Sequence, residues 1–211
     1  MALEREGVEA EVAAAAGELF AGTREWATAS DAGLFDVLGA GLTMVEAGAV
    51  AEAAGRHNFP GPVVETLAQG DVDRCRVLAA AMLLGLADRM LSMSVDYARS
   101  REQFGRPIAG FQAVQHRLAE MAVAVESVRS LAYLAQLGAV PAAAAKAHAS
   151  AAAREVAEAA LQVHGGIGFT AEHPLSAYFL RTLELRSAWG DEHALRRELG
   201  LGLLELEAVP S

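Results

Sequence analysis

Residues 73–101 read DRCRVLAAAMLLGLADRMLSMSVDYARSR, and this stretch decides the fold class. Its apolar side chains fall on almost every side of a helix, as expected for a helix buried among other helices. A second long helix is predicted over residues 111–137, because apolar residues from Met121 to Ala135 alternate in steps of three and four. Residues 102–108 are expected to form the loop between these two helices. An alanine-rich run from Pro141 to Gln162 predicts a third long helix, because proline suits the first helical turn and the following Gly165 and Gly166 suit a helix end.

Two further helices are predicted over residues 174–188 and 191–206. The last one carries leucines on one side, at Leu195, Leu199, Leu203 and Leu206. We therefore expect an all-α fold, with a four-helix up-and-down bundle as domain 71–211. Domain 1–70 has helical stretches at 8–20 and 44–55 separated by glycines, and it predicts a short N-terminal helical appendage. No closely spaced runs of alternating β-branched and aromatic residues suggest a sheet.

Composition narrows the functional classes. The chain has 211 residues, 53% of them apolar, and a net charge of -10, which disfavours nucleic acid as a partner. The longest apolar stretch, 77–87, has 11 residues, well short of the roughly 20 that cross a bilayer. The acidic start lacks the basic and apolar pattern of a signal peptide, and the single cysteine fits a reducing compartment. We expect a cytoplasmic protein without membrane spans.

The sequence gives little support for a metal site or for a nucleophilic catalytic residue. A di-iron bundle needs Glu-x-x-His pairs, and no glutamate here has a histidine three residues on. The six histidines are scattered one per element, whereas a metal needs converging ligands. No Gly-x-Ser-x-Gly elbow occurs, and Cys75 fits a small buried apolar residue. We predict no metal site.

Two short segments leave alternatives open. The glycines of residues 164–169, His-Gly-Gly-Ile-Gly-Phe, could let a backbone approach a phosphate or a flat ring, or could end a helix in a tight turn. Similarly, Arg99, Arg101 and Arg106 could form an anion site, or could be the solvated end of a helix where cations suit the dipole.

Together these segments resemble a known family. Residues 97–108 read YARSREQFGRPI and are followed by FQAVQH at 111–116, and residues 162–174 read QVHGGIGFTAEHP. Both closely resemble the C-terminal bundle of flavin-dependent acyl-CoA dehydrogenases, and the likeness runs from about residue 71 to 206. The ending Trp-Gly-Asp-Glu-His at 189–193 is similar to actinobacterial, steroid-type heteromeric members. Residues 41–62 resemble part of that family's N-terminal helical domain, and the family's middle β domain is missing.

The resemblance implies a chemistry for which this chain lacks the base. In the family a carboxylate removes the α proton of an acyl-CoA while a hydride leaves the β carbon for the flavin. That carboxylate sits at one of two positions, which fall here on Cys75 and Trp189. Asp191 and Glu192 lie close by, but the plain register places them among flavin-contacting positions. We therefore assign no catalytic residue to this chain.

The resemblance also implies that FAD is bound across a subunit interface. Six residues match positions that hold the ADP part of the neighbour's FAD: Arg101, Phe104, Gln112, Gln162, Gly165 and Gly166. Arginine suits pyrophosphate, a phenyl face suits adenine, and glycine permits close backbone approach. The positions that would hold the chain's own FAD carry unsuitable residues. Asp191 replaces a usual Thr and adds negative charge near the pyrophosphate.

The implied function is that of a short subunit of a FAD-dependent acyl-CoA dehydrogenase. It would complete the FAD site of a full-length homologue, in an α2β2 assembly, while the partner binds most of the acyl-CoA and supplies the base. Two alternatives remain: a non-catalytic homo-oligomeric scaffold without flavin, and a truncated acyl-CoA dehydrogenase. The acyl group itself is not specified by the sequence.

Overall fold

The computed structural model describes the backbone of residues 2–207 and the side chains of residues 7–205. Its helices are α1 Ala2–Gly22, α2 Trp26–Asp31, α3 Met44–Arg56, α4 Val63–Ala68, α5 Val72–Ser100, α6 Gln112–Gln136, α7 Ala142–His164, α8 Leu175–Ser187 and α9 Glu192–Glu207. Short 3-10 turns lie at Ile108–Gly110 and Gly165–Phe169. The all-α prediction is confirmed.

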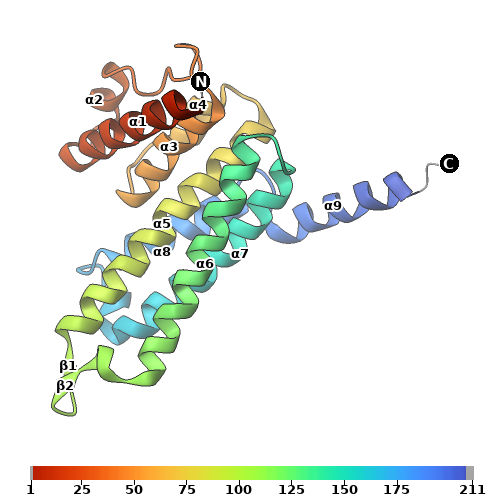
Figure 1. The fold of residues 1–211 in the computed structure, drawn as a ribbon. Helices are drawn as coiled ribbons and strands as arrows, with labels where there is room; N and C mark the ends of the chain where they lie inside the picture. Colours follow the sequence, from red (N-terminus) through yellow and green to blue (C-terminus); the bar gives the residue numbers. More distant parts are fainter. Residues whose placement is uncertain (1, 208–211) are drawn as a thin grey trace.

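Helices α5 to α8 form the up-and-down bundle, with the N-terminal helices at one end and a β-hairpin at the other (Figure 1). The sequence predicted a plain loop after α5. The structure instead pairs β1 Glu102–Gln103 with β2 Arg106–Pro107 in antiparallel register, with Gln103 opposite Arg106. Phe104 and Gly105 make the two-residue turn, both at positive φ, as in a type I′ hairpin. These are the only strands within residues 2–207.

The N-terminal helices share one core with the bundle. Apolar side chains from α1, α3, α4, α5, α6, α7 and α8 belong to a single buried cluster. Thr43 and Glu46 form a capping box that fixes the start of α3. The segment between α1 and α3 is held by stacked rings, Trp26 lying 4.5 Å from Phe35. The short helices α2 and α4 were not predicted, because six residues carry too little periodicity.

Helix α5 is apolar because it lies at the centre of the fold. By length and composition it could cross a membrane, but 78% of its most apolar window is buried inside the fold. Asp71 caps its start by accepting a hydrogen bond from the Arg74 backbone N–H at 2.8 Å. The prediction of a helix surrounded by others is thus confirmed for residues 72–100.

The last helix departs from the prediction of a bundle member. Only its first turns pack on α7, where Leu195 is fully buried against Ala143 and Ala147 and Leu199 lies beside them. Beyond that point α9 projects away from the bundle (Figure 1). Leu201, Leu203 and Leu204 are exposed, so the leucine stripe expected to pack is in contact with the bundle only at its beginning. The side chain of Leu206 lies outside the described residues.

Candidate functional site

The six predicted cofactor residues come from segments that meet at the hairpin end of the bundle. Arg101 follows α5, Phe104 stands at the hairpin tip and Gln112 begins α6. Gln162, Gly165 and Gly166 lie at the end of α7. Because α5 and α7 both run toward the hairpin, their last residues lie at the same end (Figure 1). The structure therefore brings residues 101–112 and 162–166 to the same end of the bundle, although helices α6 and α7 separate them in the sequence.

This end of the bundle is open to a ligand. All six residues are exposed, and Phe104 is 93% exposed. Gly165, at φ +63°, and Gly166 have no atom within 4 Å of the point where a Cβ would stand. Among the described side chains, Arg101 forms no ion pair, so its guanidinium is available to an anion. Arg106 instead lies 4.2 Å over the ring of Phe111, which stiffens the base of the hairpin.

A stack of rings joins the two halves of the site. Tyr97 of α5 stacks on His164 of α7 with ring centroids 4.5 Å apart, and the ring centroid of His173 lies 4.8 Å from that of His164 in a tilted arrangement. His164 Nδ1 is 2.8 Å from the carbonyl oxygen of Ala160, which makes Nδ1 the protonated nitrogen. Burial is the main cause that lowers the pKa of His164, and the neighbouring His173 adds to it. A neutral His164 therefore buttresses the turn at Gly165.

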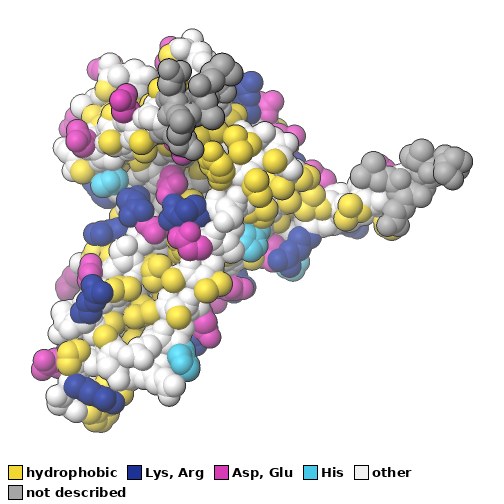
Figure 2. Space-filling view, in the orientation of Figure 1, with side chains coloured by type: hydrophobic (Ala, Val, Ile, Leu, Met, Phe, Trp, Pro, Cys, Tyr) yellow, Lys and Arg dark blue, Asp and Glu magenta, His cyan; other side chains and the backbone are white. Residues whose placement is uncertain are grey.

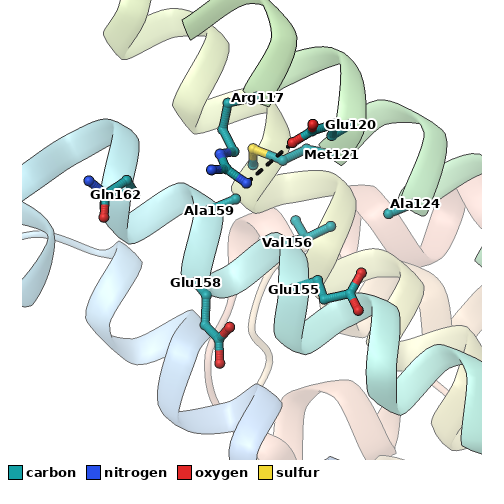
Figure 3. Close-up of a pocket in the computed structure, with 9 residues that line it drawn as sticks. All are labelled: Arg117, Glu120, Met121, Ala124, Glu155, Val156, Glu158, Ala159 and Gln162. Atoms are coloured by element: carbon teal, nitrogen blue, oxygen red, sulfur yellow. Dashed lines mark hydrogen bonds and ion pairs between the residues drawn. The ribbon is translucent and has the colours of Figure 1, made fainter. Parts of the chain in front are cut away.

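A groove of about 460 Å³ lies between α6 and α7 and ends at Gln162. Figure 3 shows Arg117 and Glu120 projecting from α6, and Glu155 and Glu158 from α7. Arg117 pairs with Glu120 at 3.2 Å. Carboxylates outnumber cations along this groove, so it would repel a pyrophosphate. An anionic group at this end is therefore more favourable beside Arg101 than along this groove.

Cys75 and Trp189, the two positions that the resemblance predicted for the family's base, lie close together at the other end of the bundle. Cys75 is buried in the first turn of α5, and burial raises the pKa of its thiol, as do Glu65 and Asp71. Arg76 Nε donates to the backbone carbonyl of Trp189 at 3.1 Å, and its other nitrogens hold Glu198 in a two-point contact at 2.9 Å. Trp189 is partly buried at φ +55°. Neither position offers a carboxylate.

The nearby carboxylates Asp191 and Glu192 already have structural contacts. Asp191 accepts a hydrogen bond from the Ala194 backbone N–H at 2.9 Å and so caps α9. That bond is the main cause that lowers the pKa of Asp191. Glu192 pairs with Arg196 one turn along the helix at 2.9 Å. Both groups therefore stabilise the first turns of α9 locally.

Sequence reasoning missed Lys146, which is fully buried beneath this loop. Its ammonium donates to Ser150 Oγ at 2.9 Å and to the Arg186 carbonyl at 3.2 Å. Burial, with Arg186 and Arg76 nearby, lowers the pKa of Lys146 to about 8, against the opposing pull of Asp191. A lone lysine in an alanine-rich helix carries no pattern that would have identified it.

The part of the chain that the structure describes contains no group of three or more His, Cys, Asp and Glu side chains that could hold a metal ion. His148 contacts Ser127 Oγ at 2.8 Å, and that hydroxyl lies 2.7 Å from the carbonyl of Ala124. The hydroxyl proton is therefore directed to the backbone, which leaves His148 to donate rather than to act as a base.

Comparisons with known proteins identify the family of the helical bundle. The family described as "Acyl-CoA dehydrogenase, C-terminal domain" matches residues 66–204. Acyl-CoA dehydrogenase IpdE2 of Mycolicibacterium smegmatis is 43% identical over 115 residues, which cover 54% of this chain and 37% of that protein. The chain thus spans little more than a third of the length of such curated relatives.

Solved structures give the same result for the fold. A variant of the Tcur3481–Tcur3483 steroid ACAD matches with a TM-score of 0.89, covering 97% of this chain and 100% of that one, at 19% identity. Butyryl-CoA dehydrogenase from Megasphaera elsdenii matches with a TM-score of 0.60 and 30% identity over 67% of this chain and 38% of that one. The resemblance predicted from residues 97–116 and 162–174 is confirmed. The chain belongs to the acyl-CoA dehydrogenase family through that family's C-terminal domain.

Proposed function

We propose that this chain is a short subunit of a FAD-dependent acyl-CoA dehydrogenase that completes the flavin site of a full-length homologue. The observation that carries this is an asymmetry between the two ends of the bundle. The hairpin end presents an unpaired Arg101, an exposed Phe104 and open glycine backbone. The other end has Cys75 and Trp189 where the family places its base. The chain can thus hold a dinucleotide but has no group to remove a proton.

The residues of the hairpin end fit the ADP half of FAD. Arg101 would donate to the pyrophosphate, and Phe104 would stack on the adenine. Gln112 and Gln162 would donate amide hydrogens to ribose or phosphate oxygens, and Gly165 and Gly166 would let the backbone come close. When bound, FAD accepts the hydride that leaves the β carbon of the acyl-CoA. The partner's carboxylate would take the α proton.

The assembly is proposed as α2β2, with the acyl-CoA bound mainly by the partner. Support comes from the solved structure with the matching fold. Its name joins two proteins, Tcur3481 and Tcur3483, and describes a steroid ACAD. We propose a steroid or related lipid acyl-CoA as the substrate class on the same support. A cytoplasmic location is proposed from the single, buried Cys75, which fits a reducing compartment. Residues 1–70 are proposed as the remnant of the family's N-terminal helical domain.

Coexpression with a full-length homologue tests the proposal. We expect a yellow complex with one FAD per heterodimer that desaturates acyl-CoA, whereas this chain alone is inactive. Arg101→Ala and Phe104→Ala should lower the FAD content with little change in melting temperature, because both side chains are exposed. Arg117→Ala, which removes an exposed arginine paired with Glu120, is the matched control and should keep the flavin.

Three results would contradict the proposal. Desaturation of acyl-CoA by this chain alone would assign it a base. A stable homo-oligomer that binds no flavin, even with the homologue present, would favour the scaffold alternative. Equal loss of FAD in the Arg117→Ala control would show that general charge, rather than Arg101, holds the ligand.

A further inference from the structure

A cavity of about 360 Å³ lies where the N-terminal helices meet the bundle. Phe20 and Ala21 of α1 form its apolar wall, and the remaining lining residues are Arg24, Arg56, His57, Arg89 and Tyr178. No carboxylate lines it, although the chain has 27 acidic residues against 17 basic ones. Figure 2 shows Lys and Arg side chains, interspersed with Asp and Glu, at the waist between the N-terminal helices and the bundle.

The arginines are fixed around the cavity by backbone and ring contacts. Arg24 donates to the carbonyl of His57 at 3.1 Å, and the Tyr178 hydroxyl donates to the carbonyl of Arg56 at 2.8 Å. Arg89 lines the cavity beside Tyr178, and its charge opposes the rise that burial causes in the pKa of that phenol. These contacts come from the end of α1, the end of α3, α5 and α8. The cavity is therefore closed only when the N-terminal helices are docked on the bundle.

Their charge is poorly compensated. Arg56 pairs with Asp88, but the same carboxylate is also 3.4 Å from Arg129. Among the described side chains, neither Arg24 nor Arg89 forms an ion pair with a carboxylate. The pKa of His57 is lowered, by burial first and then by Arg56, Arg89 and Arg24, as expected where positive potential is concentrated.

We propose that this cavity binds a small phosphate-bearing ligand. Its volume is at the lower end of the range for small-molecule sites, roughly 300–1,000 Å³, which suits a small molecule better than a protein segment. A phosphate suits a cavity lined by three arginines, because a guanidinium group presents paired N–H donors to two oxygens. A single carboxylate would leave most of this charge uncompensated. The ligand is either a free phosphate or diphosphate, or the phosphate end of a larger cofactor or thioester.

The inference does not rest on the proposed flavin role, because none of the six residues of the hairpin end lines this cavity. Its test uses the full chain, with any partner that copurifies. Inorganic phosphate, pyrophosphate and CoA are titrated by calorimetry at one ionic strength. We expect saturable binding that weakens by about tenfold in Arg24→Gln and in Arg89→Gln, as expected when one charged hydrogen-bonding group is lost. Both arginines are exposed, and Arg24 makes one exposed hydrogen bond to the carbonyl of His57, so we expect only a small change in melting temperature for both variants.

Arg117→Gln, which removes an exposed arginine paired with Glu120, is the matched control and should bind as the wild type does. Equal affinity for pyrophosphate and CoA would identify a free diphosphate as the ligand, whereas tighter CoA binding would identify a phosphate carried on a larger molecule. The proposal fails if none of the three probes saturates below about 1 mM, the weak end of specific affinity. It also fails if Arg117→Gln loses as much binding as Arg24→Gln.

Discussion

Gly55 of α3 and Gly85 of α5 let the two helices cross with their backbones in contact. A Cβ on Gly55 would stand 2.1 Å from the carbonyl oxygen of Met82, and one on Gly85 would stand 2.0 Å from the carbonyl oxygen of Glu52. Neither obstacle is a flexible side chain. The N-terminal helices are thus seated on the bundle at a point where no side chain larger than hydrogen fits.

Gly85→Ala should destabilise the protein by ~1–3 kcal/mol, because the helices must move apart to admit the methyl group. Gly55→Ala should act in the same direction. Gly200→Ala is the matched control, since it lies in helix α9 with nothing within 4 Å of its Cβ point. It should be neutral or stabilising by up to ~1 kcal/mol from helix propensity alone. Urea unfolding of the three variants decides; equal effects at Gly85 and Gly200 would contradict the close crossing.

Arg76 links the first turn of α5 to the loop before α9. Arg76→Lys keeps the charge but loses the two-point contact with Glu198 and the donation to Trp189, so we expect a loss of ~1–2 kcal/mol. Hydrogen exchange should speed up in residues 189–199 before the rest of the bundle. Arg154→Lys, in an exposed pair with Glu158, should cost less than ~0.5 kcal/mol. Unchanged exchange in residues 189–199 of Arg76→Lys would refute the link.

Lys146 predicts a specific pH dependence. Its folded pKa of about 8 is below the ordinary 10.5, so the unfolded chain binds the extra proton more tightly between these values. Below pH 8 the cost of burying the ammonium is present in full, and it is relieved as pH rises from 8 to 10.5. This lysine alone should therefore add up to about 3 kcal/mol of stability over that window.

The pKa values of Cys75 and Tyr178 are raised by burial, so their titration lowers stability over the same pH range and opposes the effect of Lys146. Subtracting the unfolding free energy of Lys146→Met from that of the wild type at each pH isolates the contribution of Lys146. The unfolding free energy of Lys146→Met, measured from pH 7 to 10.5, should lack the rising component that the wild type shows. Parallel curves for the two proteins would mean that Lys146 titrates normally.

Truncation of a leucine should destabilise the protein strongly in the first half of α9 and hardly at all in the second half. Leu195→Ala removes a fully buried side chain from its contact with Ala143 and Ala147 and should cost ~2–4 kcal/mol. Leu204→Ala removes a side chain that is 65% exposed and should change stability by less than ~0.5 kcal/mol. Thermal melts of both variants check this. A large loss from Leu204→Ala would show that the outer half of α9 packs against something in solution.

The sequence was sufficient for the long helices because their apolar periodicity extends over many turns. The boundaries of α6 and α7 were predicted within two residues. The hairpin was missed because two-residue strands carry no alternation, and its turn has Phe104 at positive φ where Asn or Gly is usual. The projection of α9 was missed because a leucine stripe predicts burial without saying against which surface.

Only part of the candidate site could be predicted from the sequence. The family resemblance predicted Arg101 and the other five cofactor residues. The structure adds that all six are exposed and lie at the same end of the bundle, which depends on the directions of the helices. The arginine cavity had no sequence signal, because Arg24, Arg56 and Arg89 are spaced far apart and meet only through the docking of α3 on α5. The buried Lys146 was missed for the same reason: its environment is built by α8 and the loop before α9.

The stacking of Tyr97 on His164 has a consequence for the order of events during folding. It joins chain segments separated by the whole of α6 and most of α7, so closing it has a high loop-entropy cost and we expect the contact to form late. A ligand at the hairpin end consequently meets a finished surface. It can select the folded chain by mass action, but it cannot template the early collapse.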